Sequence, residues 1–223
     1  SESITLPLRD GFNYNFTVDW GDGSSSEVTS FDDLDRVHTY ATAGDYTITI
    51  TGTMETIYFN DVGDKEKIIS IPNLGHMGWM SFRSAFMGCS NLESVAGGDT
   101  SSVTDMAYMF SSAASSNPDT SGWDTSSVTD MSFMFYQAAS ANPDTSGWNT
   151  SQVTTMESLF DGALLANPDT SSWDTSQVTS FVGMFRGAEI ASPETSDWDT
   201  SEVTNMTSMF HDAVAAAPVV RGH

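Results

Sequence analysis

Carboxylates that recur at one fixed spacing are the residues of this sequence with the clearest chemistry. They form two columns in which the members lie 25 residues apart: Asp119, Asp144, Asp169 and Glu194, and then Asp99, Asp124, Asn149, Asp174 and Asp199. Stacked carboxylates repel one another, and Ca²⁺, which takes about six to eight oxygen ligands, relieves such repulsion. The candidate calcium residues are Asp119, Asp124, Asp144, Asp169 and Asp174.

A structural role explains the same acids without a metal. Asp side chains accept hydrogen bonds from the backbone amides of their own turns. Calcium loops place several carboxylates within one short segment, as in D-x-[DN]-x-[DN]-G, and this sequence contains no such segment. Both interpretations stay open at this point, and we expect no cofactor other than this possible calcium.

Hydroxyl residues flank both acid columns and extend the candidate face. The threonines at 120 and 125, with their equivalents, could form a flat array that orders water on ice, although Ser and Thr also bond within turns. We expect a ligand on this polar turn face, whose candidate residues are Asp119, Thr120, Ser121, Asp124, Thr125, Asp144, Thr145, Asp169, Thr170, Asp174, Thr175, Glu194 and Thr195.

The same residues argue against catalysis. The sequence has no G-x-S-x-G motif for a nucleophilic serine and no histidine spacing typical of a zinc site. Its acids recur from repeat to repeat, whereas an active site has no reason to recur. We therefore expect a protein that is not an enzyme.

A repeat of 25 residues must position these side chains. It reads approximately N-P-D-T-S-x-W-D-T-S-x-V-T-x-M-x-x-M-F-x-x-A, and its Val, Phe and Trp columns run without insertion from Val103, Phe110 and Trp123. Stacked repeats turn each column into a ladder of like residues, with the apolar columns inside. The spacing of Val103, Met106 and Phe110 suits one face of a short helix, but a short strand followed by a tight turn fits equally.

The first sixty residues follow a different pattern. Apolar residues alternate with polar ones from Tyr14 to Trp20, and Gly21-Asp22-Gly23 then marks a turn. Such alternation is typical of half-buried antiparallel strands. We predict an α+β repeat protein with a β-sandwich over 1–60, a linker and irregular capping repeat over 61–98, and a leucine-rich-repeat-like solenoid with a C-terminal cap over 99–223.

Composition limits the classes of partner. Seven Lys and Arg stand against 30 Asp and Glu, so the formal net charge is −23. Such a charge repels nucleic acid, and a single cysteine, Cys89, permits no intrachain disulfide. No apolar run is long enough to cross a bilayer, so we expect neither nucleic-acid binding nor membrane insertion.

Two stretches carry resemblances to known families. Val18-Asp19-Trp20-Gly21-Asp22-Gly23-Ser24, followed by His38-Thr39-Tyr40 and Gly44-Asp45-Tyr46, resembles the polycystic-kidney-disease (PKD) type of β-sandwich. The 25-residue unit resembles the leucine-rich-like repeats of BspA-type bacterial surface proteins and mycoplasma-type lipoproteins. The repeat resemblance implies a secreted or cell-envelope protein, often a modular adhesin, without enzymatic activity in these modules.

The expected function is adhesion. We expect a non-catalytic binding module at the cell surface, a monomeric segment of a larger chain, whose partner is a protein or glycan of a host or neighbouring cell. Two alternatives remain: a passive spacer within a long surface protein, and an ice-binding face formed by the threonine and serine ladders.

Overall fold

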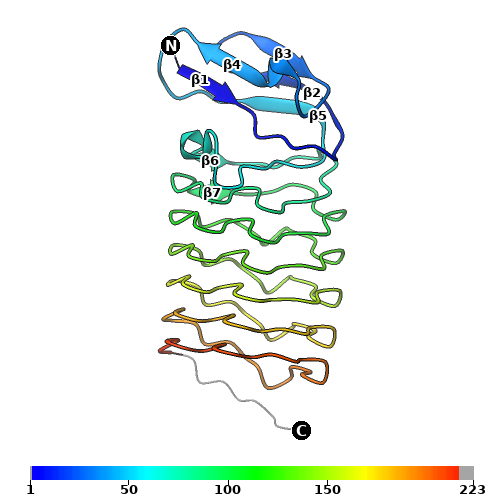
Figure 1. Ribbon diagram of the computed structural model, residues 1–223, viewed down its shortest axis with the longest axis vertical. Coiled ribbons are helices and arrows are strands. Elements are labelled where there is room, and N and C mark those ends of the chain that lie inside the picture. The colour runs from blue at the N-terminus through cyan, green and yellow to red at the C-terminus, as the bar shows by residue number, and fades with distance from the viewer. Residues whose placement is uncertain (1, 216–223) are drawn as a thin grey trace.

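Two small antiparallel sheets form the N-terminal part of the computed structural model, which describes residues 2–215 (Figure 1). Strand β1 (Glu2–Thr5) pairs with β4 (Val37–Tyr40). Strand β2 (Tyr14–Asp19) lies between β3 (Ser25–Val28) and β5 (Thr49–Met54). The 3₁₀ helix η1 (Leu34–Arg36) leads into β4.

Alternation along β2 explains why this segment is a strand. Every second residue of β2 is buried, and the intervening residues are exposed. Trp20 is fully buried after the strand, and His38 stacks on it with ring centroids 4.8 Å apart. His38 Nε2 lies 2.9 Å from Asp22 Oδ2. A Cβ at Gly21 would lie 2.5 Å from the Thr47 carbonyl oxygen, so only glycine fits there.

A stack of coils follows β5, and Figure 1 shows the coils one below another. The first contains the 3₁₀ helix η2 (Lys65–Lys67) and β6 (Ser70–Ile71), which pairs in parallel with β7 (Ser94–Val95) of the next. Elsewhere the coils are joined by parallel bridges of one residue each, which link Thr56, Ser81, Asp105, Asp130, Thr155, Ser180 and Asn205 in order.

The predicted α+β class with a leucine-rich-repeat-like solenoid is wrong. The chain is nearly all β, and residues 2–215 contain no α-helix and only small sheets. The segment expected to be helical in each repeat is a series of tight turns, in which Tyr108 and Ser112 both have φ of 60°. A left-handed residue cannot continue a right-handed helix, so the apolar spacing arises from turns instead.

Ladders of identical aromatic residues form the core of the stack. Phe110, Phe135, Phe160 and Phe185 are fully buried, and neighbouring rings stack with centroids 5.5 to 5.7 Å apart. Trp148 and Trp173 are buried in the same manner, 6.0 Å apart. The tryptophan column therefore serves packing.

The predicted domain boundaries at 60 and 98 remain a prediction. The predicted C-terminal cap falls at the end of the chain, where residues 216–223 lie outside the described part.

Truncating one ring of the ladder should destabilise the stack. Phe135→Ala removes stacking on two neighbouring rings and leaves a cavity at a fully buried site, so we expect the free energy of unfolding to fall by about 3–5 kcal/mol. Urea denaturation monitored by circular dichroism measures the change. Phe31→Ala, at a side chain 37% exposed, is the control and should cost under about 1 kcal/mol.

Candidate functional site: an acidic ridge on the coil stack

Each acid of the first column is held by a turn that it closes itself. Asp119 Oδ1 accepts one hydrogen bond from the Ser121 amide (3.1 Å) and one from the Ser121 hydroxyl (2.7 Å). The next two coils repeat the arrangement at Asp144 and Asp169 with distances of 2.6 to 3.0 Å. These are the turn bonds that the structural interpretation of the acids predicts.

The second column uses the same turn and shows what the turn requires. Asp124 and Asp174 each accept a hydrogen bond on Oδ1 from the amide of the serine two residues ahead. Asn149 takes the same position and accepts from Ser151 N (3.1 Å) and Ser151 Oγ (2.8 Å). The turn therefore needs an acceptor oxygen and does not need a negative charge.

We define the acidic ridge as the exposed acids of both columns: Asp119, Asp144, Asp169, Glu194, Asp99, Asp124, Asp174 and Asp199. Hydrogen bonds from the following serine, first from its hydroxyl and then from its amide, lower the pKa of Asp119, Asp144 and Asp169 below the usual 3.8. Repulsion between these three acids raises the pKa of Asp144 by a smaller amount. The ridge is thus ionised at neutral pH.

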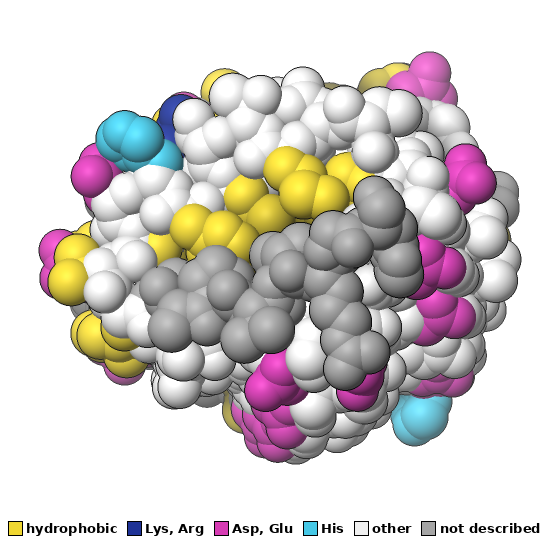
Figure 2. Space-filling model, turned by 90° about the horizontal axis from the view of Figure 1, so that it is seen from below, with side chains coloured by type: hydrophobic (Ala, Val, Ile, Leu, Met, Phe, Trp, Pro, Cys, Tyr) yellow, Lys and Arg dark blue, Asp and Glu magenta, His cyan; other side chains and the backbone are white. Residues whose placement is uncertain are grey.

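One oxygen of each aspartate of the first column stays available. In the described part of the chain, the hydrogen bonds of Asp119, Asp144 and Asp169 all involve Oδ1, which leaves Oδ2 for solvent or a partner. Figure 2, which views the stack from below, shows acidic side chains gathered at the right and lower edges of the molecule. The ridge can therefore bind cationic groups.

The ridge does not form a metal centre of the expected kind. Within residues 2–215, no three His, Cys, Asp or Glu side chains are grouped so that they could hold a metal ion. Each turn contributes one carboxylate, and the candidate calcium residues Asp119, Asp124, Asp144, Asp169 and Asp174 are not gathered into one shell. Calcium, with its need for several oxygens at once, does not fit this donor set.

The threonines of the predicted face lie inside the stack. The side chains at 120, 125, 145, 170, 175 and 195 are at most 5% exposed. The hydroxyls of the first five bond the backbone of the next coil. Thr145 Oγ1, for example, donates to the Asp169 carbonyl (2.7 Å) and Thr170 Oγ1 to the Glu194 carbonyl (2.7 Å). The expectation that these threonines contact a ligand, or order water on ice, is therefore corrected: a ligand outside the stack reaches only the acids and serines.

A second group, which is half-buried and which the sequence analysis missed, breaks the repetition of the columns. Tyr108 and Phe133 stack at 4.7 Å, Tyr136 packs edge-on against Phe133, and the Arg83 guanidinium lies 5.5 Å from the Tyr108 ring. The later coils have Ser158, Gly183 and Ser208 in the Tyr108 column. We call Arg83, Tyr108, Phe133 and Tyr136 the aromatic strip. The change from aromatic residues to serine and glycine along this column was the sequence signal that could have revealed the strip.

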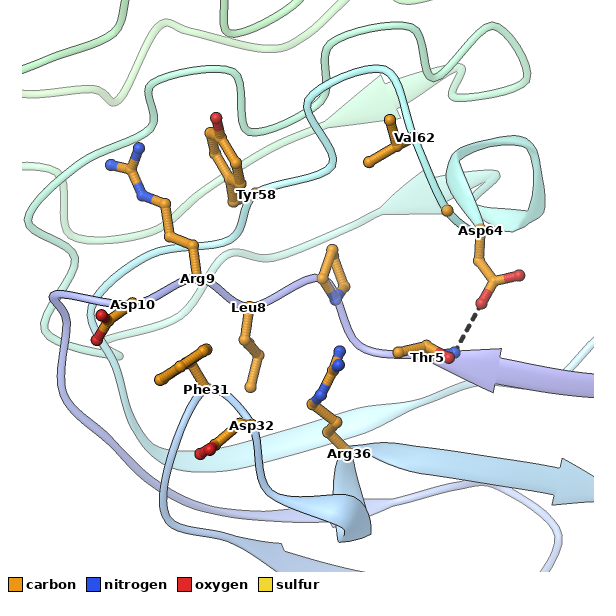
Figure 3. A pocket seen from close by; sticks show the side chains of 12 residues that line it. Thr5, Leu8, Arg9, Asp10, Phe31, Asp32, Arg36, Tyr58, Val62 and Asp64 are labelled. Atoms are coloured by element: carbon orange, nitrogen blue, oxygen red, sulfur yellow. Dashed lines mark hydrogen bonds between the residues drawn. The ribbon is translucent and has the colours of Figure 1, made fainter.

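A cavity of about 550 Å³ lies between the N-terminal sheets and the first coil (Figure 3). Three separate segments line it, at 5–10, 31–36 and 58–64. Its polar groups join these segments to one another: Arg36 donates to the Leu6 carbonyl (3.1 Å), and Asp64 accepts from the Thr5 amide (2.7 Å). We therefore assign the cavity to the junction and not to the candidate site.

Removing a buried threonine hydroxyl should destabilise the stack. Thr145→Val leaves the Asp169 carbonyl without its 2.7 Å bond at a fully buried position, and we expect a loss of about 1–2 kcal/mol in the free energy of unfolding. Thr154→Val is the matched control, because its exposed hydroxyl bonds the Thr129 carbonyl at 3.1 Å. Equal losses in urea denaturation of the two variants would contradict the internal role of Thr145.

Comparisons with known proteins identify one family. A family model described as "Mycoplasma protein of unknown function, DUF285" matches residues 58–169 and 141–218, which together make up more than half of the chain. No curated protein and no solved structure matches the chain. None of the helices in residues 2–215 is long and apolar enough to cross a membrane.

Proposed function

This chain belongs to the family of Mycoplasma proteins of unknown function DUF285, and we propose that it is a non-catalytic adhesion module that binds a cationic protein surface through its acidic ridge. The resemblance of its repeat to BspA-type surface proteins supports a place at the cell exterior. The recurrence of the acids, each engaged in closing its own turn, supports a binding role over catalysis.

The observation that carries the proposal is the row of carboxylates with one oxygen bonded and one available. Asp119, Asp144 and Asp169 occupy equivalent positions in successive coils, so their Oδ2 atoms repeat at the coil spacing. Lys and Arg form charge-assisted hydrogen bonds with such oxygens. A partner with several basic residues in a row would engage several coils at once, and individually weak contacts would add up through multivalency.

The net charge of −23 supports the same class of partner. A charge of this size accelerates association with basic surfaces and repels acidic ones. Exposed charge pairs are weak and are screened over about 8–10 Å at ordinary ionic strength. Binding should therefore depend on salt and on the number of coils engaged.

Neutralising three acids of the ridge tests the proposal. The variant Asp119→Asn/Asp144→Asn/Asp169→Asn keeps the Oδ1 acceptor, and Asn149 shows that the turn forms with an amide. We expect affinity for surface-immobilised poly-L-lysine, measured by biolayer interferometry at 0.15 M salt, to fall at least about tenfold. The control variant Glu2→Gln/Glu27→Gln/Asp45→Asn changes the net charge equally at exposed positions of the N-terminal part and should bind almost as the wild type does.

Three results would contradict the proposal. Equal losses in both variants would mean that net charge alone governs binding and that the ridge is no site. The variants can also be tested for binding to arrays of cell-surface proteins. If the ridge variant still binds such an array and the variant Tyr108→Ser/Phe133→Ser does not, the function belongs to the aromatic strip. The serines at 158 and 208 show that the column accepts this residue. Wild-type protein that binds neither probe would be a spacer.

The pH dependence of binding follows from the lowered pKa values. The turn hydrogen bonds hold the pKa of Asp119, Asp144 and Asp169 below 3.8 in the folded protein, so their charge is present above that pH and is lost as pH falls through the lowered pKa. We expect affinity for poly-L-lysine, whose charge is constant in this range, to be unchanged between pH 7 and pH 4.5. A decline that begins above pH 5 would contradict the ridge as the site.

A further inference from the structure

Two arginines stand apart from the other basic residues of this acidic chain. Within residues 2–215, an ion pair with a carboxylate is formed by each of Lys65, Lys67, Arg83 and Arg186. In the same part of the chain Arg9 and Arg36 form no such pair, although the sequence has 30 Asp and Glu. Both arginines line the cavity of about 550 Å³ at the junction. Positive charge without a counter-ion is therefore gathered at one cavity.

Aromatic rings and one hydroxyl hold the Arg9 guanidinium in place. Its central carbon lies 4.6 Å from the centre of the Phe12 ring and 4.5 Å from that of the Tyr58 ring. Its Nη2 donates to Ser81 Oγ (3.2 Å). The ring faces attract the cation and take over part of the role of a carboxylate. Arg9 thus fixes one wall of the cavity and adds positive charge beside it.

Arg36 is firmly positioned, but its hydrogen-bond donors are only partly used. It is the last residue of η1, its carbonyl accepts from the Leu6 amide (2.9 Å), and its Nη1 donates to the Leu6 carbonyl (3.1 Å). The other donors of this guanidinium have no acceptor in the part of the chain that the structure describes. A guanidinium presents its donors as a planar fork that matches the two oxygens of a carboxylate. The unused side of the Arg36 fork is therefore available to such a group.

Apolar side chains form much of the remaining wall. Leu8, Phe31 and Val62 each come from a different one of the three segments that line the cavity. Phe31 is 37% exposed and Val62 is 62% exposed, so a molecule from solvent can reach this wall. Figure 3 shows the side chains of Leu8, Phe31 and Arg36 lying toward one another. Binding sites for small ligands combine such apolar walls with a few polar groups, in volumes of about 300–1,000 Å³.

We propose that the junction cavity binds a carboxylate that carries an apolar body. The carboxylate accepts charge-assisted hydrogen bonds from Arg36. The apolar body packs against Leu8, Phe31 and Val62, and the area that it buries adds to the affinity. A peptide C-terminus that ends in an apolar residue and a free aliphatic acid share this chemistry. The site is separate from the acidic ridge and does not depend on the function proposed for the ridge.

Three acids at the cavity limit the charge that a ligand can bring. Asp64 is paired with Lys67 (2.7 Å), which offsets its charge. Asp10 and Asp32 are exposed and accept hydrogen bonds within their own loops. They repel a second negative group, so the cavity favours a monocarboxylate over a dicarboxylate. The charge of the acidic ridge is screened over about 8–10 Å at ordinary ionic strength, which limits its effect on a ligand here.

Isothermal titration calorimetry on the full chain tests the proposal with paired probes at neutral pH. Octanoate is compared with octanol, and the peptide acetyl-Gly-Ala-Leu with a free C-terminal carboxylate is compared with its C-terminal amide. We expect at least one acid to bind at least about tenfold more tightly than its uncharged partner. Binding of the peptide acid alone, or of octanoate alone, supports the proposal and identifies the source of the carboxylate. NMR shifts of the Asp32 and Gly63 amides, which line the cavity, should locate the ligand there.

Three variants separate the contribution of the charge from that of the apolar wall. Arg36→Gln removes the charge and keeps a side-chain N–H donor, so it should cancel the preference for an acid over its uncharged partner. Phe31→Ala removes an apolar contact at a side chain 37% exposed and should weaken the acid and the uncharged probe alike. Leu34→Ala is the control, because Leu34 is 86% exposed and does not line the cavity, and it should bind as the wild type does.

Four results would overturn the proposal. They are that neither acid binds, that each acid binds no better than its uncharged partner, that a folded Arg36→Gln variant keeps the preference for the acid, and that the NMR shifts avoid the residues that line the cavity. If Arg36→Gln does not fold, the comparison of acids with uncharged probes and the variant Phe31→Ala still decide the question.

Discussion

The backbone hydrogen bond between one coil and the next is the interaction on which the rest of the structure depends. In four rows through the regular coils, which start at the amides of Met106, Tyr108, Phe110 and Ser112, it joins a donor to a carbonyl 24 residues later, as from Phe135 to Leu159. Because the register is the same in four parallel rows, the length of every coil is fixed, and an insertion in one arc would break several bonds at once. Identical side chains then lie above one another, and the phenylalanine ladder follows from the backbone.

This constraint also decides which polar atoms are free to act. The buried threonine hydroxyls bond backbone carbonyls of the next coil, and Oδ1 of each turn aspartate bonds its own serine, so neither group can serve a ligand without weakening the fold. Side-chain oxygens such as Oδ2 of Asp144 are not used in this way. On a face that repeats from coil to coil, only atoms that stacking does not require can bind a ligand. The aromatic strip differs, because the later coils do not repeat its aromatic residues.

The sequence predicted the period, the inward apolar columns and the packing role of the tryptophans, because a constant spacing has only one compact solution. It did not distinguish a helix from a series of turns. Consecutive turns of the arc each span three residues, as in the bonds from Met109 N to the Met106 carbonyl and from Ala113 N to the Phe110 carbonyl. Apolar residues therefore recur at nearly the spacing of a helix. It also placed Thr120 outside, because side-chain polarity does not show whether a hydroxyl bonds water or the next coil. The aromatic strip depends on contacts between coils that a single repeat does not display.

The N-terminal end of the stack is closed by the chain itself, because the amides of Phe59, Asn60 and Asp61 donate to carbonyls of the first arc. Between coils the backbone bonds run in both directions. Phe135 N donates forward to the Leu159 carbonyl, whereas Thr154 N donates back to the Thr129 carbonyl. Each coil therefore presents donors and acceptors to both of its neighbours, and all of them must be met at once. The register of one row thus fixes the register of the others, and the exact period of the sequence follows from this requirement.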